Sequence, residues 1–349
     1  MRIAGLGVAI PSRRVDNHDL VELIATQRPR DSLSAVVARS VMDLLLSAGS
    51  KTRYYRDLKR GECARDLLGL AMQRALEQAG LTPDAVDLLI YCGIGRAFME
   101  PGNAYIFANQ LGIRCDCFDI CDACMGWLRA TQVAYDALRA GRYRHVLVVN
   151  AEFGVYELFE DCFRVSSPFD LRRTFPAFTI GEAATATVLR ASPDNWSFTF
   201  RNRPDLAGLC TIPLPGHAGF VEPNSELARA DPMRFRANSG ELFAAATEEL
   251  TQLLREQIPD LTQPNLFVPH AASYTAQRDA AQRLGIASDR LYNEIMPRYG
   301  NVTSASVPLA LHCAAQEGRL RAGDDVVLCP ASAGVSVAVA RFRWQPMGG

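Results

Sequence analysis

The chain has 349 residues, of which 48% are hydrophobic, and it contains 25 glycines and 19 prolines. This length exceeds the usual size of a single domain, so we expect two domains, or one duplicated domain, around a large buried core. Lys and Arg number 37 against 38 Asp and Glu, and the formal net charge of -1 argues against nucleic acid or an anionic membrane as the main partner.

The N-terminal segment, residues 1–14, has only a short apolar stretch that ends at Pro11. It lacks the basic start and the long hydrophobic centre of a signal peptide, and no apolar run in the chain approaches the length of a membrane span. We therefore expect a cytoplasmic protein. Ten cysteines in such a chain do not suggest the disulfide framework of a small secreted domain, so we expect them to serve core packing and chemistry.

Segments with helical periodicity alternate along the chain with short runs of aliphatic and β-branched residues. After an N-terminal strand, the segment 66–79 places its apolar side chains on one face and stops at Gly80, which predicts a helix and its end. The remaining expected elements follow in this order: a strand at 86–93, a helix near 124–140, a strand at 145–150, a helix near 240–256, a strand at 265–270, a helix near 303–317 and a strand at 325–330. This alternation predicts an α/β fold whose sheet is largely parallel and buried on both faces.

The second half of the chain repeats the order of the first half. Corresponding positions lie about 180 residues apart, as in three pairs: Asp87 with Asn265, Cys124 with Thr303 and His145 with Asp325. We expect two similar halves, 1–190 and 191–349, and the alternative is a coincidence among α/β segments.

Four cysteines crowd one segment, CDCFDICDACMGW, at positions 115, 117, 121 and 124. The segment lacks the paired C-x-x-C motifs of structural zinc sites, so we expect no metal site. Cys121 and Cys124 have the C-x-x-C spacing of a redox pair, but the Gly-Trp and the helix that follow do not distinguish an oxidoreductase from packing. In the third interpretation, Cys124 alone is reactive.

Cys124 stands at the start of the amphipathic helix expected near 124–140. Unpaired N–H groups and the positive end of the helix dipole would stabilise a thiolate there. The same N–H groups can hold the oxyanion that forms when the thiolate attacks a thioester. A buried and inert residue is the alternative for any cysteine considered singly.

Two polar residues in the second half favour the nucleophile. His270 ends the strand at 265–270, and the ends of strands in α/β sheets commonly carry chemistry, although it can also be an ordinary loop histidine. Asn301 stands at a Gly-Asn turn before a helix whose first turn must contain Pro308, although Asn is also a common turn residue. By the repeat, one crevice can collect Cys124, His270 and Asn301 as a nucleophile with two polar partners.

Several longer motifs span nearly the whole chain: GLGVAIPSRRVDN, GSKTR, FDICDACMGW, GRYRHVLVVNAE, TIGEAATATVL, VPHAAS, GNVTSASVPLAL and GDDVVLCPASAGVSVAVARF. With these motifs the sequence resembles the β-ketoacyl-acyl-carrier-protein synthase III group of the thiolase superfamily. The resemblance implies a five-layered α-β-α-β-α fold built from two duplicated halves. The half 1–190 would carry the nucleophilic cysteine, the half 191–349 would carry the histidine and the asparagine, and the protein would be a homodimer.

The resemblance also implies a reaction in two stages, the first being transfer of an acyl group from a thioester to Cys124. His270 and Asn301 would then hold the carbonyl of a second thioester while its carbanion forms, usually by decarboxylation of a malonyl group. The backbone N–H groups of Cys124 and Ala333 would form the oxyanion hole. The implied substrates are thioesters of coenzyme A or of an acyl carrier protein, with no permanently bound cofactor.

Some positions depart from the family. The Trp and Arg that commonly hold the adenine of coenzyme A are replaced by Asp43 and Ser47, and the basic residue expected after the catalytic histidine is replaced by Thr275. Arg278 or Arg283 is a candidate for the missing charge, and the alternative for each is an exposed helix residue.

Glu100, in FMEPGNA, stands where synthase III enzymes place an aromatic residue that reaches across the dimer into the partner's acyl pocket. A glutamate there, together with the long segment 26–48, is similar to the thiolase-like enzymes of olefin biosynthesis. Those enzymes join two fatty acyl groups head to head and use the glutamate as a base. In a dry pocket the pKa of the carboxyl would rise towards the working pH, as a base requires, and a solvated loop acid is the alternative.

We therefore expect an enzyme that condenses acyl thioesters by a Claisen reaction through an acyl-Cys124 intermediate, in fatty acid, polyketide or related secondary metabolism. Acyl transfer to an oxygen, nitrogen or sulfur nucleophile stays open, as does a non-catalytic partner subunit of a heteromeric synthase. Aromatic side chains can line an acyl pocket, although core packing is their commoner fate, and seven are candidates: Phe153, Tyr156, Phe159, Phe163, Phe169, Phe175 and Phe178.

Overall fold

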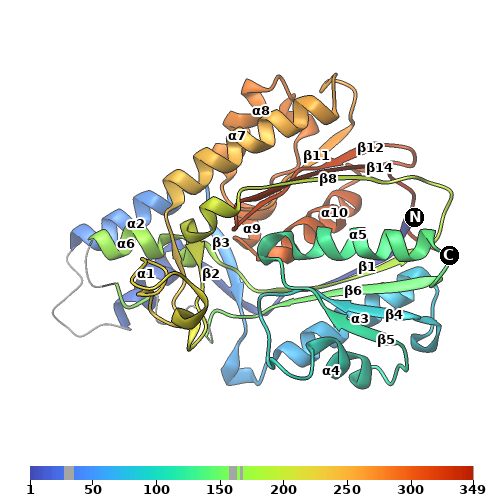
Figure 1. Cartoon of the computed structure of the whole chain (residues 1–349), viewed down its shortest axis with the longest axis horizontal. Helices are drawn as coiled ribbons and strands as arrows, with labels where there is room; N and C mark the ends of the chain where they lie inside the picture. Colours follow the sequence, from blue (N-terminus) through green and yellow to red (C-terminus); the bar gives the residue numbers. More distant parts are fainter. Residues whose placement is uncertain (27–34, 157–162, 166–167, 349) are drawn as a thin grey trace.

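The computed structural model describes residues 1–26, 35–156, 163–165 and 168–348. Two five-stranded sheets lie face to face in this part of the chain (Figure 1). The first sheet has the strand order β1 (Arg2–Ala9), β7 (Ala183–Arg190), β6 (His145–Glu152), β4 (Leu88–Tyr91) and β5 (Asp116–Asp119). The second sheet runs β11 (Leu266–Val268), β12 (Asp325–Leu328), β14 (Ser336–Arg343) and β13 (Ala331–Ser332), with β8 (Ser197–Asn202) also paired to β14.

Helices form three layers around these sheets. The outer face of the first sheet is covered by α3 (Ala64–Ala79) and α4 (Asn103–Gln110). The layer between the sheets consists of α5 (Gly126–Arg139) and α10 (Ser306–Gln316), and the outer face of the second sheet carries α7 (Ser239–Gln257) and α8 (Tyr274–Arg283). The predicted five-layered α-β-α-β-α fold is therefore confirmed.

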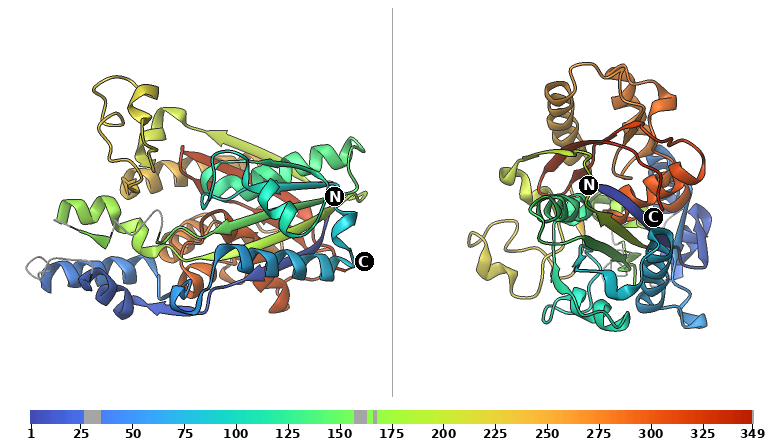
Figure 2. Two further views of the ribbon diagram at one scale, coloured as in Figure 1. Left: turned by 90° about the horizontal axis from the view of Figure 1, so that it is seen from below. Right: turned by 90° about the vertical axis from the view of Figure 1, so that its right-hand side faces the viewer.

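The remaining elements surround one end of this assembly: β2 (Arg13–Asp16), α1 (Asn17–Thr26), α2 (Ala35–Ala48), β3 (Thr52–Tyr55), α6 (Pro168–Thr174), β9 (Cys210–Thr211), β10 (Arg236–Ala237) and α9 (Ile295–Tyr299). Figure 2 shows that α1, α2 and α6 lie at the end opposite to the two chain termini. None of the described helices is long and apolar enough to cross a lipid bilayer.

The sheets are mixed, so the prediction of a largely parallel sheet was wrong. In the first sheet β4 runs parallel to β5 and β6, whereas β7 is antiparallel to β1 and β6. In the second sheet only β11 and β12 are parallel. A strand buried on both faces has the same apolar composition in either orientation, so its sequence does not report strand direction.

The close approach of β1 to α3 depends on two glycines. A Cβ atom added at Gly5 would lie 2.0 Å from the Ala75 carbonyl oxygen, and one at Gly7 would lie 1.9 Å from the Ala71 carbonyl oxygen. Any larger residue would push the helix off the strand. The GLG motif therefore serves packing in the outer layer rather than ligand binding.

The two central helices are enclosed between the sheets. Eight of the 11 residues of α10 are buried, including Pro308 in its first turn. The α5 helix buries Trp127, Leu128 and Thr131 between the sheets. Because both helices are enclosed on two sides, their N-terminal ends are fixed relative to both sheets.

Candidate active site

Two short turns meet at the centre of the molecule. One is a 3-10 turn, Ala123–Met125, that leads into α5, and the other is a 3-10 turn, Thr303–Ala305, that leads into α10, and the two turns contact each other. Ala123 has φ 44° and Thr303 has φ 46°, so both adopt the left-handed conformation that non-glycine residues rarely occupy. The residues that follow them, Cys124 and Ser304, therefore occupy corresponding places in the two halves.

This correspondence corrects the predicted repeat by one residue, because Cys124 matches Ser304 rather than Thr303. The spacing of 180 residues also relates the first residues of the two helices, Gly126 and Ser306. Cys124 itself lies in the turn, two residues before the α-helix begins.

Cys124 faces a cavity of about 620 Å³. His270, Asn301 and Ala333 also line this cavity, so the structure brings together four of the five predicted site residues. The other walls are mostly apolar and come from α2, α7, α8 and the segment around Thr179. Ala333 follows β13, a strand that contacts the turn of Cys124.

Burial controls the ionisation of Cys124. Removal from water raises the pKa of its thiol well above the usual range, and Cys210 and Glu152 raise it further by charge repulsion. The backbone N–H group of Cys124 acts in the opposite direction but is weaker. The predicted stabilisation of a thiolate by N–H groups at this turn therefore has the expected direction, and desolvation is the larger effect.

His270 lies just beyond the end of β11 and is 4% exposed. Burial lowers the pKa of its imidazole to about 4, although a backbone hydrogen bond with Thr303 opposes the shift. The ring is therefore neutral at pH 7. Its Nδ1 atom is buried and forms no hydrogen bond within the described residues.

Asn301 is held by its backbone and by one side of its amide. Its N–H donates to the Thr179 carbonyl oxygen at 2.7 Å, and its carbonyl accepts from the Gly181 N–H at 3.0 Å. Its Oδ1 atom accepts the N–H of Thr303 at 2.9 Å, which leaves the amide NH2 group as the donor that can meet a ligand. Gly300 allows this close approach, since a Cβ atom there would lie 2.5 Å from the Thr179 carbonyl oxygen and its φ is +74°.

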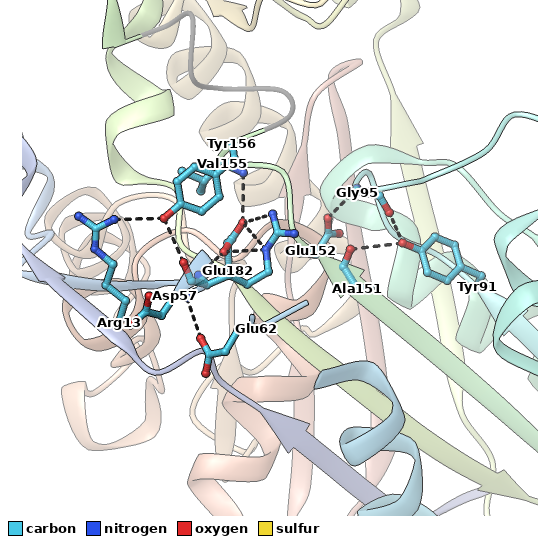
Figure 3. Close-up of polar contacts among 11 residues, drawn as sticks. Arg13, Asp57, Glu62, Tyr91, Gly95, Ala151, Glu152, Val155, Tyr156 and Glu182 are labelled. Carbon is cyan, nitrogen blue, oxygen red and sulfur yellow. Dashed lines mark hydrogen bonds and ion pairs between the residues drawn. The ribbon is translucent and has the colours of Figure 1, made fainter. Parts of the chain in front are cut away.

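The segment that holds Asn301 is itself anchored by a buried ion pair (Figure 3). Glu182 forms an ion pair with Arg56 at 3.0 Å, and its carboxylate also accepts the backbone N–H of Arg56 at 2.7 Å. Burial raises the pKa of the Glu182 carboxyl, while Arg56 lowers it. The pair therefore ties the loop after β3 to the start of β7, next to the strand-like contact between Ile180 and Asn301.

Glu100 is exposed and does not line the cavity of its own chain. Its predicted action as a base concerns the partner's pocket in a dimer, so that role stays a prediction. Exposed apolar side chains lie on either side of it and on the nearby edge strand β5 and helix α4: Phe98, Met99, Tyr105, Ile106 and Phe118.

Two of the positions that depart from the family, Ser47 and Thr275, line the cavity. Thr275 on α8 donates its hydroxyl to the Ser47 carbonyl oxygen at 2.5 Å, and Asp43 is exposed on the same helix as Ser47, α2. Arg278 bonds to the hydroxyl of Tyr274 on its own helix at 2.8 Å. Neither Arg278 nor Arg283 lines the cavity, so neither supplies a charge to its wall.

Two residues that contribute to the site were missed in the sequence. Glu152, at the end of β6, is 5% exposed and contacts the Ser304 turn. Cys210, on β9, lines the cavity. The motif VVNAE offered a signal for Glu152, because an acidic residue at the end of a buried strand needs hydrogen-bond donors or a cation to offset the cost of its burial.

The aromatic candidates mostly pack in cores. Phe153, Phe163 and Phe178 are buried in apolar clusters, whereas Phe175 lines the cavity. Phe159 and the side chain of Phe169 lie outside the described residues. Within the described ranges, no group of three His, Cys, Asp or Glu side chains is placed to hold a metal ion.

The five-layered fold, with two corresponding turns that meet at one cavity, is a thiolase-like fold that solved structures share. Two family models match the chain: 3-oxoacyl-[acyl-carrier-protein (ACP)] synthase III over residues 118–202, and the C-terminal domain of the same enzyme over residues 259–344. In both segments the chain is therefore similar to the synthase III condensing enzymes.

Curated relatives and solved structures show the same similarity. The chain is 28% identical to the β-ketoacyl-[acyl-carrier-protein] synthase III of Symbiobacterium thermophilum, with 98% of this chain and 97% of the relative covered. It is 29% identical to the same enzyme of Gloeobacter violaceus, with 99% and 98% covered.

Two crystal structures share the fold at lower identity. The 3-oxoacyl-[acyl-carrier-protein] synthase III of Aquifex aeolicus has a TM-score of 0.79 at 23% identity, with 98% of this chain and 99% of that chain covered. A cysteine-to-serine variant of Xanthomonas campestris OleA with bound lauric acid and lauroyl-CoA has a TM-score of 0.81 at 23% identity, with 98% of each chain covered.

Proposed function

We propose that this protein joins two acyl thioesters by a Claisen condensation that proceeds through an acyl group on Cys124. The observation that carries the proposal is that Cys124, His270, Asn301 and Ala333, from four separate segments, line one apolar cavity. The curated relatives are named for an acyl carrier protein, and the OleA structure holds lauroyl-CoA. These names support thioesters of coenzyme A or of an acyl carrier protein as the substrates.

In the first stage, the sulfur of Cys124 attacks the thioester carbonyl and the bond from that carbonyl to the donor's sulfur breaks. Because burial keeps Cys124 protonated, its proton must leave as the new bond forms, and it ends on the departing thiol. The backbone N–H groups of Cys124 and Ala333 would stabilise the negative oxygen of the tetrahedral intermediate.

In the second stage, the α-carbon of another thioester attacks the acyl group on Cys124. The carbanion arises either by loss of carbon dioxide from a malonyl group or by transfer of an α-proton to a base, for which Glu100 of the partner subunit is the candidate. That base, or solvent, then returns a proton to the departing sulfur of Cys124. The amide NH2 group of Asn301 and the ring N–H of His270 would hold the carbonyl oxygen on which the charge develops. A lowered pKa suits His270 to this task, because a neutral imidazole donates a hydrogen bond without giving up its proton. Collapse of the intermediate then releases Cys124 and a β-ketoacyl thioester.

We also propose that two copies of the chain form a homodimer through β5 and α4. The strand β5 is an edge strand of the first sheet, paired only with β4, and Phe98, Met99, Tyr105 and Phe118 around it are exposed. An unpaired edge with an apolar surface favours pairing with an identical edge. Glu100 lies in this surface, where it would reach the partner's cavity.

Intact-mass measurement after incubation with acyl-CoA and acyl-carrier-protein thioesters tests the first stage. The wild type should gain the mass of the acyl group, Cys124→Ala should gain none, and Cys117→Ala should behave as the wild type because Cys117 does not line the cavity. An adduct on the Cys124→Ala variant would refute the assignment.

Product analysis by mass spectrometry tests the second stage and the base. A new carbon–carbon bond supports condensation, whereas an ester, amide or new thioester would show acyl transfer to a heteroatom. Failure to form any acyl-enzyme would favour a non-catalytic partner subunit. Glu100→Gln should abolish condensation of thioesters without a malonyl group yet spare acylation of Cys124, and unchanged condensation would remove Glu100 from the reaction.

A further inference from the structure

The molecule buries two glutamates close to its centre, and they have different partners (Figure 3). Glu182 is neutralised by the guanidinium of Arg56. Glu152 forms no ion pair with any described Lys, Arg or His, and its carboxylate accepts hydrogen bonds only from neutral groups. A carboxylate buried without a cation is costly, so its retention points to a role beyond packing.

Neutral donors from two segments surround the carboxylate of Glu152. The N–H groups of Ile94 and Gly95 lie 3.1 and 3.3 Å from its Oε2 atom. The N–H group of Ser304 lies 3.2 Å from its Oε1 atom, and the Ser304 hydroxyl bonds to the same oxygen. Burial raises the pKa of the Glu152 carboxyl, and these donors oppose that shift by stabilising the charged form.

These contacts connect Glu152 to each part of the cavity. Ile94 lines the same cavity as Cys121 and Cys124. Ser304 follows Thr303, whose backbone bonds to the amide of Asn301 and to the ring of His270. One carboxylate thus joins the wall beside the nucleophile to the turn that orients the two carbonyl-binding side chains.

We propose that Glu152 is a positioning residue of the condensation: it locks the Thr303–Ser304 turn and the Ile94–Gly95 loop in place, and its negative charge adds to the burial that holds Cys124 in the thiol form before substrate binds. The proposal rests on Cys124 being the acylated residue. Glu152 acts through Ser304 and through its field, without contact to the substrate.

A cysteine that stays protonated until substrate binds has a chemical advantage in this cavity. A free thiolate reacts with oxidants and with unrelated electrophiles, whereas a thiol becomes nucleophilic only when a bound thioester and its oxyanion donors favour the attack. The negative charge at Glu152 opposes the thiolate but has less effect on the neutral acyl-enzyme. Loss of that charge should therefore make Cys124 of the resting enzyme more reactive. Loss of the positioning contacts should make the second stage less efficient.

The pH dependence of alkylation at Cys124 tests the charge without any substrate. Peptide mass spectrometry after treatment with iodoacetamide would follow Cys124, with the exposed Cys121 of the same protein as an internal reference. In Glu152→Gln the alkylation midpoint of Cys124 should fall by about half a pH unit or more, because a repelling charge is gone. Glu62→Gln is the matched control, since Glu62 also accepts backbone N–H groups, but from Ser12 and Asp57, which do not line the cavity. Its alkylation midpoint at Cys124 should stay at the wild-type value.

Condensation kinetics test the positioning. Glu152→Gln should lower kcat by about tenfold or more, because the misplaced turn moves His270 and Asn301. Glu152→Asp keeps the charge, but its shorter side chain moves the carboxylate away from its hydrogen-bond donors. This variant should therefore lower kcat while the alkylation midpoint of Cys124 stays unchanged. If Glu152→Gln does not fold, the kcat of Glu152→Asp tests the proposal instead. An unchanged midpoint in a folded Glu152→Gln, or a wild-type kcat in Glu152→Asp, would overturn the proposal. Lack of acylation in the wild type would instead overturn the proposed function.

Discussion

The turns at Cys124 and Ser304 have the same backbone shape but different surroundings. Each follows a residue with positive φ and leads into a central helix. Cys124 faces the cavity, whereas Ser304 is 1% exposed and bonds to Glu152 and to the amide of Asn150. The fold therefore supplies two equivalent sites, and the side chains packed against each turn decide which one can meet a substrate.

Exchange of the two side chains should have the largest effect. Cys124→Ser should lose acylation by a factor of about a thousand or more, because a serine hydroxyl is a far weaker nucleophile without an adjacent base. Adding Ser304→Cys to this variant should not restore acylation, since residue 304 is closed off by Glu152 and Asn150. Intact-mass measurement with acyl thioesters checks both variants, and an adduct on residue 304 would show that the two turns are exchangeable.

The next largest effect should be on the pH dependence of the free energy of unfolding, through His270. Burial lowers the pKa of His270 from 6.5 to about 4, so between these values the unfolded chain binds a proton that the folded chain does not. Stability supplied by the neutral ring is complete above pH 6.5 and is lost as pH falls towards 4, by up to roughly 3 kcal/mol. His270→Asn should flatten that part of the curve relative to the wild type in urea unfolding between pH 4 and 7.

Ser304→Ala should have a smaller effect, on stability more than on acylation. The change removes a hydroxyl that contacts Glu152, accepts the Asn150 amide at 2.8 Å and lies 2.8 Å from the Cys92 carbonyl oxygen, so three buried groups lose a partner. We expect a loss of about 1–3 kcal/mol in the free energy of unfolding. Denaturant unfolding measures this loss, and intact mass should show that Cys124 is still acylated. A loss of acylation at full stability would contradict the structural role of Ser304.

The smallest effect concerns the backbone. Ala123→Gly and Thr303→Gly would each relieve a left-handed conformation, which costs a residue with a side chain about 1–2 kcal/mol, although glycine adds flexibility to the unfolded chain. We expect each variant to change the free energy of unfolding by less than about 1 kcal/mol. Thermal unfolding of the pair would show whether the strain is equal in the two turns.

Much of this arrangement was predictable from the sequence. Helical periodicity located α3, α5, α7 and α10, and the repeat of about 180 residues indicated that Cys124, His270 and Asn301 could share a crevice. The motifs predicted the family, which the family models and relatives support. These signals are local in the sequence or repeat along it, so they can be recognised in one sequence.

Other features depend on contacts that no local pattern records. The antiparallel pairing of β7 with β1 and β6 arises from how long connections return to the sheet. The rise in the pKa of Cys124 depends on enclosure by several layers, and Cys210 reaches the cavity from a distant two-stranded sheet. Glu152 was overlooked because its partners, Ile94 and Ser304, lie more than fifty residues away on either side.

The position of α5 and α10 between the two sheets has a consequence for how the protein loses activity. The turn of Cys124 is continuous with α5, while His270 follows β11 and Asn301 precedes α10, so the site depends on packing from both sheets at once. Neither half can unfold locally and leave the other with a working set of residues. Inactivation by denaturant should therefore coincide with global unfolding, which makes enzyme activity a direct reporter of the cooperativity of the whole fold.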